Sequence, residues 1–372
     1  MQKKLLALAV AAAVSAPAFA DNNVTVYGKF DVSYDVINTG TATNGTAGTT
    51  SARVSSNTSK FGLKGNEDLG NGLSAIWQVE SLVNVGNGGS AGTGIGGRNT
   101  FLGLSSASVG TLLMGRHDTP YNISTRAYDV FGDGIADNRN MMGGVGTYAS
   151  GSLAGAYSAV AGFDGRQDQV VAYISPKFGD VFTLAAAYVN LNPTLQNTAA
   201  QGKDSAVSAA GMFASAGFTG SVAYESHTAN SIAAGLKESA AKVGAGYSND
   251  QFSLAAVYEK TSDNAGVAGA NLLGHKAAYA SATFNVTEAD KIKLAYTRVG
   301  SFSGSNGASQ ASVGFDHNLS KRTTVYALYS KLTNKSASNY SFATTSSVGG
   351  ASTSAGVGAA PSVFALGVKH TF

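Results

Sequence analysis

The stretch that decides the fold is residues 24–36, which read Val-Thr-Val-Tyr-Gly-Lys-Phe-Asp-Val-Ser-Tyr-Asp-Val. The apolar side chains share one parity: Val24, Val26, Phe30, Val32, Tyr34 and Val36. The other parity carries Thr25, Lys29, Asp31, Ser33 and Asp35. Because successive side chains of a strand point to opposite faces, this pattern predicts a strand with one apolar and one charged face. Its length exceeds the roughly 5–6 residues of ordinary strands and suits the roughly 9–11 that cross a bilayer.

The same alternation recurs to the last residue of the chain. Clear examples are residues 73–80, 182–188, 252–259, 291–297 and 364–372. About sixteen such segments are separated alternately by short turns and by long polar links. The long links are residues 39–51, 84–97, 190–203, 261–274, 301–309 and 333–359, and the longest runs from 118 to 167. Short turns on one side and long loops on the other are typical of outer-membrane barrels.

The polar parity decides the architecture, because it carries Lys, Asp and Glu in mid-strand. Membrane barrels place the apolar parity outside and a polar lumen inside. The sheet must close, since an open edge in lipid would leave unsatisfied backbone groups. The expected fold is all-β: a 16-stranded antiparallel transmembrane β-barrel around an aqueous channel. A link as long as residues 118–167 is expected to be functional.

Composition excludes several other classes. The chain has 372 residues, 47 Gly and no Cys, which excludes disulfide scaffolds and thiolate metal sites. No run of 18 apolar residues follows residue 20, so a helical membrane protein is excluded. Residues 1–20 combine Lys3, Lys4, an apolar run and a small-x-small site at 18–20, which predicts a cleaved signal peptide before a barrel domain at 21–372. Without those two Lys the net charge is 23 − 22 = +1, and no basic cluster predicts nucleic-acid binding.

The chain resembles the general diffusion porins of Gram-negative bacteria, in particular those of β-proteobacteria. The resemblance rests on VTVYGK at 24–29, KFGLKGNEDLG at 60–70, RNTFLGL at 98–104, Gly115-Arg116, FGD at 131–133, YISPKF at 173–178 and the terminal Phe372. It implies a sixteen-stranded barrel, a homotrimer and a third loop folded into the pore. It also implies an outer-membrane location among lipid and lipopolysaccharide, with the strand ending at Phe372 read by the barrel-assembly machinery.

The resemblance further implies a basic side of the pore constriction at Lys29, Lys60 and Arg98. All three have the parity opposite the apolar face, so the pattern agrees with the resemblance. Arg116 differs, because it shares parity with Leu112. Since a cation facing lipid at mid-membrane costs about 2–4 kcal/mol, Arg116 is expected near the rim or against a neighbouring subunit.

The acidic side departs from the family pattern. The family often carries Pro-Glu-Phe-Gly-Gly-Asp at the constriction, where this chain has Asp-Val-Phe-Gly-Asp at 129–133, with Val130 in place of the Glu and Arg126 just upstream. The candidates for the acid are Asp129, Asp133 and Asp137 in the loop, together with Glu80 on the lumen parity of its strand. With Arg126 and Arg139 in the loop, the sequence favours weak anion preference.

The function expected is passive transport of ions and small hydrophilic solutes, without enzymatic activity, cofactor or metal. The five His are dispersed, and Asp133 with Asp137 is the alternative for a Ca²⁺ site. G-x-G-x-x-G at 92–97 and G-x-S-x-G at 88–92 lie in a glycine-rich link without the strand and helix that such motifs need. The rival functions are a secreted adhesin, an outer-membrane enzyme and, within the channels, a solute-specific sugar porin.

Overall fold

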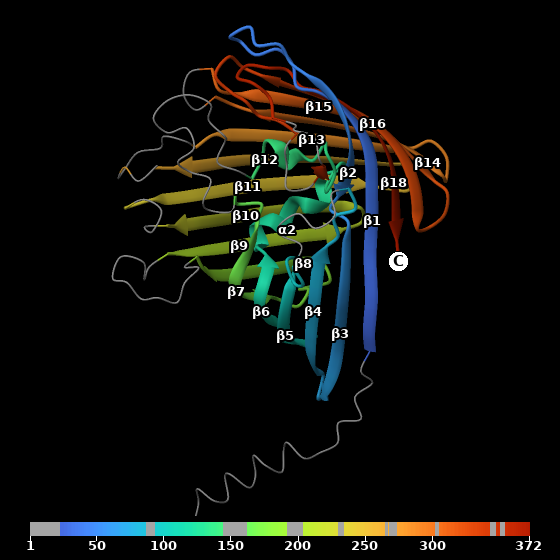
Figure 1. The fold of residues 1–372 in the computed structure, drawn as a ribbon. Coiled ribbons are helices and arrows are strands. Elements are labelled where there is room, and N and C mark those ends of the chain that lie inside the picture. The colour runs from blue at the N-terminus through green and yellow to red at the C-terminus, as the bar shows by residue number, and fades with distance from the viewer. Residues whose placement is uncertain are drawn as a thin grey trace, which may run out of the picture.

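A computed structural model describes residues 23–86, 94–143, 162–191, 204–229, 234–264, 267, 274–301, 305–342, 347–349 and 354–372. The expected signal peptide at 1–20 lies outside these residues, as does most of the pair of glycine-rich motifs at 88–97. The regular secondary structure of the described chain is almost all β-strand (Figure 1). Within it, no helix has the length and hydropathy needed to cross a bilayer.

The strands follow one another around a single sheet. Their bounds are β1 Asn23–Asn38, β2 Thr50–Asn57, β3 Lys60–Gly70, β4 Leu73–Leu82, β5 Thr100–Ser106, β6 Gly110–Asp118, β7 Arg166–Ile174, β8 Phe182–Asn190, β9 Ser205–Ser215, β10 Phe218–Thr228, β11 Lys237–Ser248, β12 Phe252–Asp263, β13 Lys276–Asn285, β14 Asp290–Val299, β15 Ala308–Asn318, β16 Thr323–Asn334, β17 Ser347–Gly349 and β18 Ser362–Thr371. Helix α2 (Pro120–Thr125) and two single-turn 3-10 helices, η1 (Arg126–Tyr128) and η2 (Asn138–Asn140), lie between β6 and β7.

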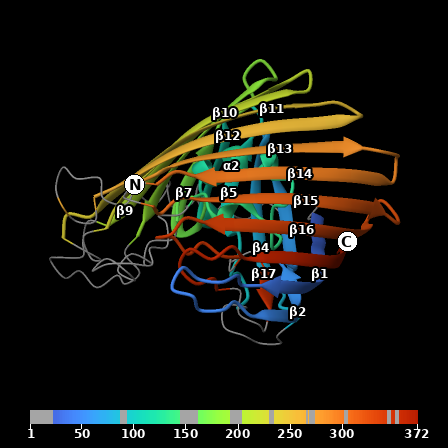
Figure 2. The same ribbon diagram turned by 90° about the horizontal axis from the view of Figure 1, so that it is seen from above.

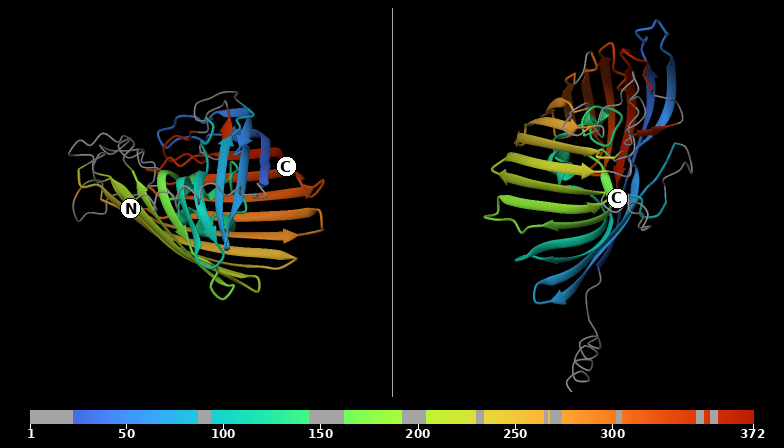
Figure 3. Two further views of the ribbon diagram at one scale, coloured as in Figure 1. Left: turned by 90° about the horizontal axis from the view of Figure 1, so that it is seen from below. Right: turned by 90° about the vertical axis from the view of Figure 1, so that its left-hand side faces the viewer.

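The eighteen described strands form a barrel of sixteen strands, because two of them count as one and one lies outside the ring. Both β2 and β3 pair with β1 along one continuous line, so the two form one barrel strand with a break at Thr58, where φ is 51°. The three-residue β17 pairs only with β2 and stands outside the ring. The remaining count is 18 − 1 − 1 = 16, every pairing is antiparallel, and β1 closes the ring on β18. Figure 2 and Figure 3 show the strands side by side around one interior. The predicted architecture is confirmed.

The alternation places the two parities as expected for a barrel in lipid. On β1, Tyr34 is 54% exposed, whereas Asp35 is fully buried on the lumen side. The same outward exposure holds for large apolar side chains around the ring, among them Val26, Leu184, Tyr258, Leu294 and Leu366. A soluble protein rarely exposes so large a continuous apolar surface. The outer wall is therefore the surface that meets acyl chains.

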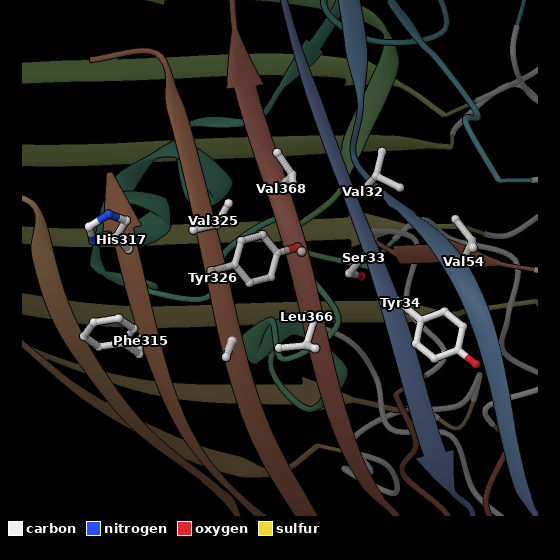
Figure 4. A pocket seen from close by; sticks show the side chains of 12 residues that line it. Val32, Ser33, Tyr34, Val54, Phe315, His317, Val325, Tyr326, Leu366 and Val368 are labelled. Carbon is white, nitrogen blue, oxygen red and sulfur yellow. The ribbon is translucent and has the colours of Figure 1, made fainter. Parts of the chain in front are cut away.

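A hydrogen bond on the lumen side stabilises the closure of the barrel between β1 and β18. Tyr326 on β16 reaches across Gly367 of β18, and its hydroxyl donates a hydrogen bond to Asp31 Oδ1 on β1 at 2.8 Å. A Cβ on Gly367 would lie 2.1 Å from the Tyr326 ring, so only glycine permits this crossing. Outside the seam lies an apolar depression of about 560 Å³ between β1, β15, β16 and β18, with Tyr34 and Leu366 at its edge (Figure 4).

Candidate functional site

The described parts of the longest link, residues 119–143 and 162–165, fold into the barrel instead of standing above it, as predicted (Figure 1). Thr119 caps its helix α2 by accepting a hydrogen bond from the Asn122 backbone, with Pro120 at the first helical position. The Tyr121 backbone then donates to Ser208 on β9, and its hydroxyl donates to Glu259 on β12 at 2.8 Å. We call this segment the inward loop.

Two separate parts of the inward loop are held at the same place on the wall. The backbone N–H of Gly143 donates to the other carboxylate oxygen of Glu259 at 3.0 Å. Asp164, just before β7, contacts Lys242 of β11, whose ammonium lies 3.9 Å from the centre of the Tyr121 ring. Charged hydrogen bonds of this kind are among the stronger ones, so the loop is held at its root.

The tip of the inward loop lies against β11, β13 and β15. The Tyr279 hydroxyl donates to Asp129 at 3.0 Å, and Ser281 donates to the Tyr128 carbonyl at 2.8 Å. A Cβ on Gly314 would lie 2.7 Å from the Phe131 ring, and one on Gly244 would lie 2.5 Å from the Tyr128 ring. The wall has glycine where the loop aromatics need close approach.

Acids and arginines form one network inside the loop. Arg126 contacts Asp137, and its guanidinium lies 3.5 Å from Asp129 and 3.3 Å from Asp133. Arg139 adds contacts of 2.9 Å to Asp137 and 3.4 Å to Asp133. The carboxylates of Asp129 and Asp137 are buried, whereas Arg126 and Arg139 keep 24% and 21% of their side chains exposed. The positive ends of these pairs therefore face water.

The three loop acids respond differently to this setting. Burial opposes ionisation of Asp137, but Arg126 and Arg139 outweigh it and hold the Asp137 pKa well below its usual value. Burial is outweighed in the same way at Asp133, whose pKa is lowered by Lys29 and Arg126. At Asp129, burial and the negative charge of Asp137 prevail over Arg126 and raise the pKa to about 6.

A second network lies in the opposite wall, on β1, β3 and β4 and just before β5. Lys29 and Lys60 face each other directly across β1 and β3. Glu80 on β4 lies between Lys60, at 3.2 Å, and Arg98, and accepts a hydrogen bond from the Tyr27 hydroxyl at 3.0 Å. Only 5% of the Glu80 side chain is exposed. Glu80 thus acts as a buried counterion for two of the predicted basic residues.

A cavity of about 660 Å³ separates the inward loop from this wall. Six cationic side chains line it, namely Lys60, Arg98, Arg116, Arg126, Arg139 and Arg166, against three acidic ones, Asp118, Asp133 and Asp164. Each lining acid has a cation beside it: Arg166 lies 2.8 Å from Asp118, Lys29 lies 3.6 Å from Asp133, and Lys242 contacts Asp164. The narrow part of the lumen is a cation-rich passage.

Some of the residues predicted from the sequence line this cavity, and others are buried behind its lining. Lys60, Arg98, Arg126 and Asp133 line the cavity, and Lys29 reaches it through Asp133. Glu80, Asp129 and Asp137 lie behind the arginines and the lysine they neutralise. Of the acids expected opposite the basic wall, Asp133 is the one whose carboxylate the cavity reaches. In the described part of the chain, no group of three or more His, Asp and Glu could hold a metal.

Arg116 lies within an irregularity of β6, where the pairing with β7 shifts between Gly115 and His117. Its guanidinium donates to the Gly97 carbonyl at 2.9 Å and to Asp168 at 2.5 Å. Asp168 is exposed, with 69% of its side chain accessible. Arg116 thus has a counterion and lines the cavity beside the inward loop. Its position at the rim or against a neighbouring subunit stays a prediction.

Sequence reasoning did not identify Arg166, Asp118 and Asp164. The face on which Arg166 lies could not be predicted from alternation. Gln169, three residues later in β7, has a φ of 53° and interrupts the regular parity of the strand. A usable signal was the pair of opposite charges at the two ends of the longest link, since Asp118 and Arg166 face each other in the β6–β7 register.

Comparison with known proteins gives concordant results. The family described as Gram-negative porin matches residues 7–337. Outer membrane porin protein 32 of Delftia acidovorans is 28% identical, covering 91% of this chain and 91% of that protein. Major outer membrane protein P.IB of Neisseria meningitidis serogroup B is 41% identical over a shorter region, 31% of this chain and 34% of that protein.

Solved structures share the architecture. A structure described as an anion-selective porin from Comamonas acidovorans has a TM-score of 0.74 at 23% identity, covering 95% of this chain and all of that one. OmpT of Vibrio cholerae, described in a trimer form, has a TM-score of 0.63 at 15% identity, covering 94% and 99%. At these identities the likeness concerns the fold.

Proposed function

Because the chain belongs to the Gram-negative porin family, we propose that its constriction is weakly anion-selective, with Lys60, Arg98, Arg126 and Arg139 as the groups that attract the ion. The general function follows from the family. The protein is a diffusion porin of the outer membrane, through which ions and small hydrophilic solutes pass passively. It is a channel and not an enzyme.

One observation carries the proposal of anion preference: the charges are segregated by depth. The charged groups near the passage nearly balance in number, but their exposure differs. Asp137, Asp129 and Glu80 have 0%, 1% and 5% of their side chains exposed, whereas Arg126, Arg139 and Lys60 have 24%, 21% and 26%. The exception is Asp133, which is 32% exposed but lies beside three cations, Lys29, Arg126 and Arg139. Apart from Asp133, an ion in the cavity therefore approaches these cations more closely than the acids behind them.

The same pairing limits the strength of the preference. Each acid lies within 4 Å of its cation, so an ion in the cavity meets the field of oriented dipoles and not of bare charges. Salt screens this field over about 8–10 Å at 0.1–0.15 M, which is comparable to the size of the passage. We infer a weak preference for anions, with cations also passing through the channel, as in a general diffusion pore.

We propose partners for the protein from its family and its outer-membrane location. We infer a homotrimer, since a related barrel is described in trimer form. Contact with lipopolysaccharide is proposed from the outer-membrane location. Phe372 offers the assembly machinery an aromatic ring 5.6 Å from Phe30, at the end of a strand that pairs with Gly28.

Current measurement across planar bilayers tests the proposal. Purified protein is inserted between two KCl solutions of different concentration, and the potential at zero current is recorded. We expect a modest potential of the sign that chloride permeation produces. A potential of cation sign would overturn the assignment of the arginines, and an absence of discrete conductance steps would overturn the pore itself.

A further inference from the structure

The sheet has an open edge at the end of the barrel that carries the short turns, which is the periplasmic end. There β1, β3 and β4 extend farther than β18 (Figure 1). β3 pairs with β1 from Asn23, whereas the register of β18 with β1 starts only at Lys29. Among the described residues, residues 23–27 of β1 therefore have a neighbouring strand on one side only. We call these five residues the open edge.

The main-chain groups of the open edge point toward the side that has no strand. Gly28 and Phe372 exchange two main-chain hydrogen bonds, at 3.0 and 3.2 Å. Because such pairs recur at every second residue of an antiparallel ladder, the N–H and C=O groups of Val26 and Val24 point in the same direction as those of Gly28. A further strand in line with β18 would bond them. Unpaired strand edges of this kind are templates for strand addition.

The outward face of the open edge is apolar. Val24 and Val26 are 57% and 56% exposed. Both lie beyond Phe30, whose ring centre is 5.6 Å from that of Phe372. Aromatic rings mark the boundaries of the apolar band in membrane barrels, so we expect the two valines on the periplasmic side of that band. Apolar side chains in water are stabilised by a partner that covers them.

The lumen face of the open edge carries a cation. Lys64 of β3 is exposed and pairs with Thr25 of β1. Its ammonium lies 5.4 Å from the centre of the Tyr27 ring, and no ion pair involves it within the described part of the chain. The backbone of a strand added beyond Thr25 would lie about 10 Å from that of Lys64, which is two strand spacings. An acidic side chain opposite Thr25 therefore comes within reach of the ammonium.

We propose that the open edge binds an extended peptide segment of a periplasmic protein, which adds to the barrel sheet as one more antiparallel strand beside β1. The segment carries apolar residues opposite Val24 and Val26 and an acidic residue opposite Thr25. Its main chain bonds the N–H and C=O groups of the two valines. The site rests on the outer-membrane location and is independent of the ion preference of the passage.

Energy transfer from Trp77 to a labelled peptide tests the site, because Trp77 is the one tryptophan of the chain. It lies near the open edge: Val24, Gly65 and Trp77 are in register on neighbouring strands, and a Cβ on Gly65 would lie 2.7 Å from the indole ring. The probe is a nine-residue peptide in which valine alternates with glutamate, with a dansyl group at its amino end. It is titrated into the detergent-solubilised protein, and we expect transfer that saturates.

Two methylated forms of the probe test the main-chain hydrogen bonds. Methylation of the valine nitrogens blocks the N–H groups that face β1, and we expect at least tenfold weaker binding. Methylation of the glutamate nitrogens blocks the N–H groups that face away, and we expect less than a twofold change. A probe with lysine in place of glutamate keeps every N–H group, and we expect severalfold weaker binding because of Lys64.

A pair of protein variants makes the same distinction on the barrel. Val24→Pro with Val26→Pro removes the two N–H groups of the open edge, and proline is tolerated where the N–H of an edge strand faces solvent. We expect at least tenfold weaker binding. Val24→Ala with Val26→Ala is the matched control, which keeps both N–H groups and is expected to lose less than the proline variant.

Equal binding by the native protein and the proline variant would overturn the site, as would equal loss with the two methylated probes. Absence of saturable transfer with the native protein would overturn it too, whether a second copy of the chain covers the edge or nothing does. Single-channel conductance of each variant is recorded alongside. Loss of conductance would count against the pore, whereas loss of peptide binding with normal conductance supports the site.

Discussion

Arg126 lies directly against Asp137, yet water reaches only one of the two. Asp137 is enclosed by its own loop, where its carboxylate accepts hydrogen bonds from the backbones of Asp133 and Arg139, both at 2.8 Å. The Arg126 guanidinium covers it from the side of the cavity. The inward loop therefore folds around a negative charge and presents a positive one. The charge that the constriction presents to an ion therefore depends on which side chains are exposed and which are buried. Substituting these residues one at a time tests this arrangement.

Replacing Arg139 is expected to weaken anion preference without unfolding the loop. In Arg139→Gln, Asp137 keeps its contact with Arg126, so no buried carboxylate is left without a cation. The passage loses one exposed positive charge, and the zero-current potential in a KCl gradient moves toward the cation side. Arg322→Gln, in the turn before β16, is the matched control and leaves the potential unchanged. A shift toward chloride in Arg139→Gln would contradict the model of exposed arginines.

Removing the charge of Glu80 is expected to strengthen anion preference and to reduce stability. Glu80→Gln leaves Lys60 and Arg98 without their shared counterion, so the potential shifts toward chloride. Breaking a buried ion pair from one side costs about 3–5 kcal/mol, which lowers the thermal unfolding midpoint. Both effects are measured on one preparation, by bilayer recording and by circular dichroism at the β-sheet band.

Tyr27→Phe separates these two effects. It removes the hydroxyl that donates to Glu80 but no charge, so it is expected to cost about 1.5–3 kcal/mol of stability with no change of potential. If Tyr27→Phe shifted the potential as far as Glu80→Gln, charge at position 80 would not be the cause.

The raised pKa of Asp129 predicts a pH-dependent ion preference. Burial raises this pKa to about 6, so Asp129 is ionised at pH 7 and mostly protonated at pH 5. The carboxylate faces Arg126 and Asp137 in the loop and Tyr279 on β13, and its protonation leaves Arg126 with one counterion fewer. Anion preference is thus expected to rise as the pH falls from 7 to 5.

Stability follows the same titration with a definite sign. A carboxyl whose folded pKa is raised favours the folded state most at low pH, and this contribution is lost as the pH rises through about 6. Asp129→Asn stays neutral throughout and should remove the pH effect on the zero-current potential between pH 7 and 5. Identical pH profiles for the native protein and Asp129→Asn would assign the effect to other groups.

Alternation predicted the wall well, because lipid demands apolar side chains on one parity of every strand. It placed Val26 and Tyr34 outside and Lys60 inside from the sequence alone. The depth of Asp137 was not predictable, since it depends on how the loop coils against distant strands. Local backbone irregularities were equally hidden: the break at Thr58 and the positive φ of Gln169 change parity without a distinctive residue type.

The position of the inward loop is expected to depend on Gly314. A side chain at this site would meet the Phe131 ring, since even a Cβ would lie 2.7 Å from it, with the wall backbone of Ala327 behind. In Gly314→Val the loop tip must therefore move away from β15, toward the wall across the cavity, which narrows the passage. Single-channel conductance is expected to fall and anion preference to rise, as Arg126 and Arg139 move with the tip toward Lys60 and Arg98. Gly220→Val is the matched control, because a Cβ there has no neighbour closer than 4.0 Å. Unchanged conductance in a folded Gly314→Val protein would show that the loop tip does not set the width of the pore.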